Sequence, residues 1–237
     1  MLDSVAASVH SKGEPLNRLL AVLPDGELQR LEPDLQIMHL EAGRVLFEAG
    51  ERADRVYFLD TGVASLTTAF ENRVAVGVAT VGREGAVGAI PLLLGGATTI
   101  GRSRVLVPGS ARTVEVPAFR RALHSSSKFL EVCETYSRAL LAQILQAVPC
   151  SRLHTAEQRC ARWLLMCADL TDDKFELTRE CLAEMLGVPR SGFDVIACRM
   201  QEAGLISDRQ GAIIVLDRQG LENAACGCYR ILHQRSE

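Results

Sequence analysis

Residues 178–204 read TRECLAEMLGVPRSGFDVIACRMQEAG, and this stretch decides how the chain is interpreted. Leu182 and Leu186 lie one helical turn apart and would face inward together on a first helix. Gly187 suits a tight turn between two helices, because glycine adopts positive φ without a steric penalty. Phe193 would then pack a second helix onto the first. The pattern predicts a helix-turn-helix whose second helix is free to enter a DNA major groove; a corner between two core helices is the alternative.

The segment after this stretch predicts a β-hairpin. Residues 205–207 (LIS) and 212–215 (AIIV) are short β-prone runs, and the intervening DRQG at 208–211 contains turn-forming residues. A hairpin directly after the second helix makes a winged helix-turn-helix. Upstream, residues 155–158 (TAEQ) form a capping box, which predicts the start of another helix.

Arg190 is the main candidate for reading a base. It lies near the exposed start of the second helix, where its guanidinium can bind guanine O6 and N7 together. The Asp194 carboxylate either accepts a hydrogen bond from cytosine N4, or caps a helix end, or repels the DNA. Arg209 at the hairpin tip either contacts a phosphate or is a solvated loop arginine. The predicted DNA-binding residues are Thr178, Arg190, Ser191, Asp194, Val195 and Arg209.

The first half of the chain has the pattern of a β-structure. Turn glycines such as Gly43, Gly62 and Gly85 separate short β-prone runs. Short strands at this spacing predict an antiparallel, jelly-roll-like β-roll. The expected strands lie at residues 44–47, 56–59, 74–78, 105–107 and 111–116.

Residues 127–148 predict one long helix with two apolar stripes. A helix on the surface of its own domain needs only one stripe, so the second indicates a partner, although an ordinary core helix also explains the pattern. We expect two copies to pair around Tyr136, Leu140 and Ile144, and Pro149 to end or kink the helix. The first stripe is Cys133, Tyr136, Leu140, Ile144 and Val148; the second is Leu130, Leu141 and Leu145.

Composition and charge narrow the class of protein. The 237 residues are 48% hydrophobic and 23% charged, which is typical of a soluble globular protein. Basic residues number 26 and acidic residues 29, so any contact with nucleic acid must be local. Within residues 155–237, 10 basic residues oppose 13 acidic ones. Affinity for DNA of arbitrary sequence should therefore be weak and strongly dependent on salt.

We find no sequence pattern of a membrane span, a signal peptide or a common enzyme active site. No apolar run approaches the roughly eighteen residues of a membrane span, so no membrane partner is expected. Residues 1–5 (MLDSV) do not resemble the start of a signal peptide. Eight cysteines without a secretion signal indicate reduced thiols in the cytoplasm. The motifs of a nucleophile elbow, a phosphate loop and a zinc protease are missing, so we do not expect an enzyme.

Several motifs in a fixed order resemble the bacterial CRP/FNR family of transcription regulators over nearly the whole chain. The resemblance implies an effector-binding roll, a dimerisation helix and a C-terminal winged helix-turn-helix. It also implies a homodimer on two-fold-symmetric promoter DNA, an unidentified small-molecule effector, and RNA polymerase as a further candidate partner. The motifs are LEAG at 40–43, FEAGE at 47–51, VYFLDTG at 56–62, GREG at 82–85, PLLLG at 91–95, EQR at 157–159, WLL at 163–165, LGV at 186–188, AGLI at 203–206 and CGCYR at 226–230.

The predicted effector pocket departs from the members of that family that bind cyclic AMP. Those members use a Gly-Glu pair for the ribose, and here the pair is Gly85-Ala86, which lacks the carboxylate. Arg102-Ser103 matches their phosphate-binding Arg-Ser pair, but one residue out of register, which turns side chains to the other face of a strand. We expect no binding of cyclic AMP; the pocket binds another ligand or nothing. Its candidate residues are Gly85, Ala86, Gly88, Arg102 and Ser103.

Metal binding is not expected from the spacing of cysteines and histidines, and the cofactor is unknown. No cysteine precedes Cys133, so the N-terminal cysteine cluster that holds iron and sulfur in oxygen-sensing relatives is missing. Cys226 and Cys228 would lie about 200° apart on a helix. Cys160 and Cys167 would be core thiols. These patterns predict neither an iron–sulfur cluster nor a metal ion.

The expected fold is α+β, in three parts. Residues 1–125 form the effector-binding-like roll, 126–154 the dimerisation helix, and 155–237 the winged helix-turn-helix. The leading hypothesis is a homodimeric transcription regulator. The alternative is a ligand-binding module whose helix-turn-helix no longer reads DNA, which Gly192, Asp194 and Val195 favour.

Overall fold

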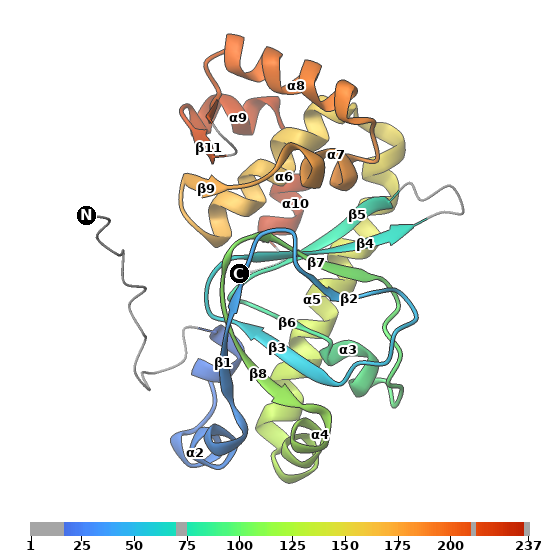
Figure 1. The fold of residues 1–237 in the computed structure, drawn as a ribbon, viewed down its shortest axis with the longest axis vertical. Coiled ribbons are helices and arrows are strands. Elements are labelled where there is room, and N and C mark those ends of the chain that lie inside the picture. Colours follow the sequence, from blue (N-terminus) through green and yellow to red (C-terminus); the bar gives the residue numbers. More distant parts are fainter. Residues whose placement is uncertain (1–16, 70–74, 210–211, 235–237) are drawn as a thin grey trace, which may run out of the picture.

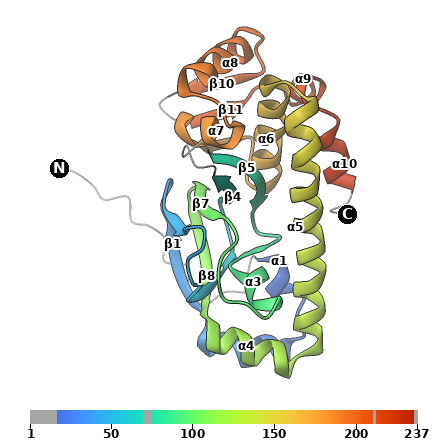
Figure 2. The same cartoon turned by 90° about the vertical axis from the view of Figure 1, so that its right-hand side faces the viewer.

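The computed structural model describes residues 17–69, 75–209 and 212–234. The molecule is elongated, with a β-roll at one end and a helical domain at the other (Figure 1). Helix α5 (Ser127–Leu153) runs along one side and reaches both parts (Figure 2). The predicted α+β fold is confirmed. Residues 1–5, on which the expectation about a signal peptide rests, lie outside the described residues.

Two four-stranded antiparallel sheets form the roll. One turn of the roll requires glycine at position 62. Gly62 has a φ of +79°, and an added Cβ would lie 2.6 Å from the Val107 carbonyl oxygen. All the expected strands are present, although Val74 lies outside the described residues. The first sheet has the order β1 (Gln36–Leu40), β8 (Gly109–Glu115), β3 (Arg55–Leu59) and β6 (Ala86–Val87). The second has the order β2 (Val45–Phe47), β7 (Arg102–Val107), β4 (Val63–Ala69) and β5 (Ala75–Val81).

Aromatic packing joins the roll to the helices that follow it. Phe58 of β3, Phe119 of α4 (Val116–Ser125) and Phe129 of α5 are fully buried, with ring centroids 5.6–6.3 Å apart. Because large aromatic side chains bury much apolar surface, this cluster holds α5 against the roll. The remaining helices of this part are α1 (Arg18–Ala21), α2 (Asp25–Leu31), η1 (Glu32–Asp34) and α3 (Ala89–Leu93).

The C-terminal part is a winged helix-turn-helix with a second core. The predicted capping box at Thr155 and Gln158 is present, and it begins α6. The hairpin β10–β11 is present too, but β9 adds a third strand that the sequence pattern did not predict. The elements are α6 (Ala156–Leu170), β9 (Lys174–Glu176), α7 (Arg179–Leu186), α8 (Arg190–Glu202), β10 (Ile206–Arg209), β11 (Ala212–Val215), α9 (Arg218–Ala224) and α10 (Cys228–Gln234).

Helix α5 differs from two of the predictions made from the sequence, one about Pro149 and one about the dimer interface. It continues through Pro149 to Leu153, so of the two alternatives for Pro149 the one in which it ends the helix is wrong. Tyr136 and Leu140 are only 6% and 5% exposed, and Ile144 packs against the same core of the roll. Their stripe therefore belongs to the inside of the protomer, and the prediction that it forms the dimer interface is wrong. The residues that face outward, here called the outer stripe, are Leu141 and Leu145 of the second predicted stripe, together with Val148, which the pattern placed in the first.

Candidate DNA interface and sensor core

Helices α7 and α8 are packed as the sequence predicts. Leu182, Leu186 and Phe193 are each 1% exposed, and they hold the two helices together. Gly187 lies at the end of α7 with φ +66°, which closes the turn between the helices. Figure 1 shows α8 at the outer edge of the molecule, at the end away from the roll. Its solvent side is therefore free to meet a large, flat or convex partner.

Three of the predicted DNA-binding residues lie on that solvent side. Arg190 begins α8, and its side chain is 63% exposed. Ser191 and Val195 are also exposed. Arg190 forms an ion pair with the exposed Glu180 of α7. An exposed ion pair contributes little free energy, so a guanine or a phosphate can displace Glu180.

Asp194 is held by a residue that sequence reasoning missed. Arg179 of α7 donates to Asp194 Oδ1 at 3.0 Å and to Asp208 Oδ2 at 2.8 Å. Asp208 belongs to β10 and its side chain is buried. Arg179 thus ties α8 and the wing to α7, and its two hydrogen bonds align them. The carboxylate of Asp194 is occupied within the protein rather than aimed at a base.

Thr178 and Arg209 are the chain neighbours of Arg179 and Asp208, which are hydrogen-bonded to each other. The Thr178 side chain accepts a hydrogen bond from the Cys181 backbone N–H at 3.2 Å and so caps α7. Arg209 ends β10 and is exposed. The neighbouring tip residues 210–211 lie outside the described residues. Thr178 therefore has a structural role beside its predicted one, whereas Arg209 is available for a phosphate.

The predicted effector residues lie in different packing environments of the roll. Ala86 is buried in β6, and the Tyr136 hydroxyl donates to its carbonyl oxygen at 3.0 Å. The Tyr136 ring also fills the space beside Gly85, where an added Cβ would lie 2.5 Å from it. Gly88 caps α3 at φ +89°. The five residues are thus part of the packed roll or its outer face.

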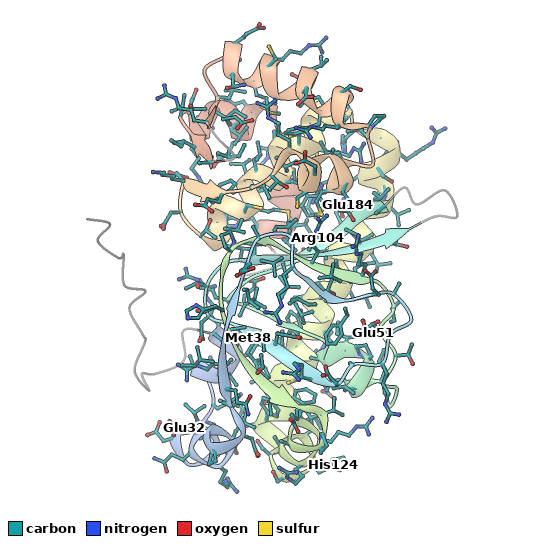
Figure 3. All side chains as sticks on the ribbon, in the orientation of Figure 1. Glu32, Met38, Glu51, Arg104, His124 and Glu184 are labelled. Atoms are coloured by element: carbon teal, nitrogen blue, oxygen red, sulfur yellow. The ribbon has the colours of Figure 1, made fainter. Side chains whose placement is uncertain are left out.

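Arg102 and Ser103 point to opposite sides of β7. Ser103 is buried, whereas Arg102 reaches Glu184 of α7 at 3.4 Å. Arg104, two residues along the strand, reaches the same carboxylate at 2.7 Å. Figure 3 shows Arg104 and Glu184 next to each other where the roll meets the helix-turn-helix. The arginine that the motif suggested for a cyclic phosphate instead links the two domains.

A second contact between the domains lies at Gly77 of β5. A Cβ placed there would be 2.4 Å from the Met185 side chain of α7. The absence of a side chain at Gly77 thus leaves room for Met185 to pack directly against β5. Glu184 and Met185 thus connect the first helix of the helix-turn-helix to strands β7 and β5 of the roll.

A cavity of about 750 Å³ lies between the roll, α5 and the helices of the C-terminal part. The Oε2 atom of Glu84 and the Oγ1 atom of Thr80 are buried in its wall without a hydrogen-bond partner among the described residues. Burial raises the pKa of Glu84. The volume of the cavity lies in the range of small-molecule binding sites. Its other lining residues include Arg83, Tyr136, Gln143, Met166, Leu170 and Tyr229.

Four possible metal ligands come together at the end of α5. The donor atoms of Cys150, His154, Cys226 and Cys228 all lie within 4.8 Å of one another. The spacing of cysteines and histidines along the chain did not predict this cluster. Cys226 precedes α10 instead of sharing a helix with Cys228, so the angle between positions on one helix does not apply.

A β-roll, a long connecting helix and a winged helix-turn-helix with a free second helix together define a DNA-binding regulator with a sensor domain. Two family models match the corresponding parts: residues 37–126 match the cyclic nucleotide-binding domain, and residues 158–224 match the Crp-like helix-turn-helix domain. The chain belongs to the CRP/FNR family of transcription regulators.

Known proteins of similar sequence or structure agree with this assignment. The HTH-type transcriptional regulator Cmr of Mycobacterium tuberculosis is 26% identical over 216 residues, which cover 86% of this chain and 82% of that protein. FixK2 of Bradyrhizobium japonicum shares the fold at 15% identity with a TM-score of 0.68, covering 81% of this chain and 98% of its own. The regulator CLP of Xanthomonas campestris does so at 14% identity with a TM-score of 0.66, covering 82% and 100%.

Among the described residues, no helix combines the length and the apolar character needed to span a lipid bilayer.

Proposed function

We propose that this regulator binds a two-fold-symmetric operator in promoter DNA as a homodimer, with α8 in the major groove of each half-site. The observation that carries this proposal is the exposed side of α8, where Arg190, Ser191 and Val195 face outward while Arg179 keeps the helix aligned. The wing residue Arg209 serves as a phosphate contact. Thr178 lies beside it at the start of α7 and is a further phosphate contact.

The outer stripe supplies the dimer interface in this proposal. Leu141, Leu145 and Val148 recur at the spacing of one helix face and are exposed in the protomer. A two-fold interface repeats the same patch on both chains, so α5 would pair with its own copy. The two α8 helices would then lie about 34 Å apart, one turn of the duplex.

The three parts of the chain have separate tasks. Residues 1–125 sense an effector, residues 126–154 pair the two protomers, and residues 155–237 read DNA. Contacts of Glu184 and Met185 with the roll support direct coupling between sensing and reading. The protein acts in the cytoplasm without catalysing a reaction, and RNA polymerase is the partner that it meets at the promoter.

Selection from random DNA tests the proposal. The full-length protein is expected to enrich one sequence with two-fold symmetry, and to bind it far more tightly than scrambled DNA of equal length. Because residues 155–237 carry more acidic than basic side chains, binding to scrambled DNA should vanish first as salt is raised. If no symmetric sequence is enriched, the protein is a ligand-binding module without a DNA-reading role.

Cyclic AMP is expected not to be the effector. Ala86 offers no carboxylate to the ribose, and Arg102 is engaged with Glu184 instead of facing Gly85. A buried ribose hydroxyl without a partner would cost about 1–3 kcal/mol. Isothermal titration calorimetry with cyclic AMP and cyclic GMP should give no heat of binding at micromolar protein. Saturable micromolar binding of either nucleotide would contradict this prediction.

A further inference from the structure

The four possible ligands at the end of α5 come from two places far apart in the chain. Cys150 and His154 lie one helical turn apart at the C-terminal end of α5. Cys226 lies between α9 and α10, and Cys228 begins α10. Figure 2 shows α10 beside the part of α5 that is nearest the helical domain. The tertiary structure thus brings two pairs of donors face to face.

The distances between the donor atoms fit a single tetrahedral ion. The Sγ atoms of Cys150 and Cys226 lie 3.6 Å apart, and Cys228 Sγ lies 3.7 Å from His154 Nδ1. With Zn–S bonds of about 2.3 Å and Zn–N bonds of about 2.0 Å, a tetrahedral site places two sulfurs about 3.8 Å apart and a sulfur and a nitrogen about 3.5 Å apart. Only small movements of the side chains would be needed.

The surroundings of the cluster suit thiolates. The three cysteines are buried and form an apolar cluster of their own, separate from the two large cores. Gln146 Nε2 donates to Cys228 Sγ at 3.2 Å. A hydrogen bond donated to a metal-bound sulfur orients that ligand and stabilises its negative charge. A disulfide between Cys150 and Cys226 would not explain why His154 Nδ1 lies 3.7 Å from Cys228 Sγ.

A buried arginine supplies the charge that such a site needs. Three thiolates, a neutral imidazole and Zn²⁺ together carry one negative charge. Arg162 is 4% exposed and, among the described residues, has no carboxylate partner. Its guanidinium lies over the Trp163 ring, 3.9 Å from the ring centroid. The Cys226 backbone N–H donates to the Gln158 carbonyl oxygen at 3.3 Å, so the cluster packs against α6 one helical turn before Arg162. A buried cation is costly unless it is paired, and the zinc site would pair it.

We propose that Cys150, His154, Cys226 and Cys228 bind one structural Zn²⁺ ion. Binding displaces the three thiol protons into solvent and involves no change of oxidation state. Thiolates with one imidazole in a tetrahedral arrangement favour zinc, and four protein ligands leave no position open for a substrate. The ion would fasten α10, the last helix of the DNA-binding part, to the end of the helix proposed for dimerisation.

Metal analysis of the full-length protein tests this directly. The wild-type protein, purified under reducing conditions, should contain one zinc per chain. Apoprotein prepared with a chelator should bind one Co²⁺ per chain and develop the ligand-field bands of a tetrahedral site together with thiolate-to-cobalt charge transfer. This titration uses the unaltered chain, so it does not depend on whether a variant folds.

Variants then identify the ligands. Cys226→Ser and Cys228→Ser should each lose stoichiometric zinc, whereas the matched control Cys198→Ser should retain it, because Cys198 is exposed on α8 and outside the cluster. His154→Ala should lose zinc, and His154→Cys should restore it with an additional thiolate signal. Gln146→Leu should weaken zinc binding by about 10- to 100-fold while preserving the tetrahedral spectrum.

Two outcomes would overturn the proposal. One is wild-type apoprotein that binds Co²⁺ no more tightly than Cys226→Ser does. The other is a purified protein without metal in which Cys150 and Cys226 are joined as a disulfide, two hydrogen masses lighter than the reduced chain.

Discussion

Replacing Leu141 and Leu145 with aspartate is expected to turn the dimer into monomers. The two side chains are 53% and 61% exposed in the protomer and lie one helical turn apart on α5. Burying a leucine in an interface is worth about 1.5–3 kcal/mol, and each dimer would bury four. A carboxylate in the same place would instead lose its water without gaining a partner.

Sedimentation at micromolar concentration and operator binding measure the effect. The double variant should sediment as a monomer and lose specific binding, because two half-sites are no longer read together. The control is Leu94→Asp, which changes a leucine that is 75% exposed at the end of α3 and lies outside the outer stripe. Leu140→Asp would report on folding instead, since Leu140 belongs to the core of the roll. A double variant that remains dimeric would show that the outer stripe is not the interface.

Arg190→Ala is expected to weaken binding to the selected operator by about 1–3 kcal/mol, which is the discrimination that a bidentate arginine–guanine contact provides. The preference at one base pair in each half-site should be lost, while binding to scrambled DNA should change little. Arg199→Ala is the matched control, because both side chains are on α8 and are 63% and 64% exposed. Arg199, paired with Glu157, should have a much smaller effect.

Arg209→Ala should behave differently in the same assay. A phosphate contact carries no sequence information, so all DNA sequences should be bound more weakly to a similar degree. The slope of the logarithm of the binding constant against the logarithm of the salt concentration should decrease in magnitude by about one. If Arg190→Ala binds the operator as tightly as the wild-type protein does, α8 does not read bases through Arg190.

The winged helix-turn-helix was predictable because its signals are local. The spacing of Leu182, Leu186 and Phe193 around Gly187 specifies which faces of the two helices pack together. All three side chains are buried. The capping box at Thr155 and Gln158 is equally local and is present. The roll was predictable in outline for the same reason, since turn glycines and short β-prone runs follow each other along the chain.

The choice between the two stripes of α5 was not predictable from periodicity. Both stripes are apolar, so the spacing does not tell which of them packs inside the protomer. The roll decides this, because Tyr136 donates to the Ala86 carbonyl and Leu140 packs into the core of the roll. The same limit applies to Asp194, whose partner Arg179 is 15 residues away on another helix.

The sequence by itself determined the order of parts, the family, and the residue types on the outer side of α8. The tertiary structure decided which surfaces remain free and which distant side chains meet. Cys150 and Cys226 are 76 residues apart, and nothing in the spacing of either pair points to the other. Periodicity and caps act over a few residues through backbone geometry, whereas a cluster such as Cys150, His154, Cys226 and Cys228 exists only once α10 has packed against α5.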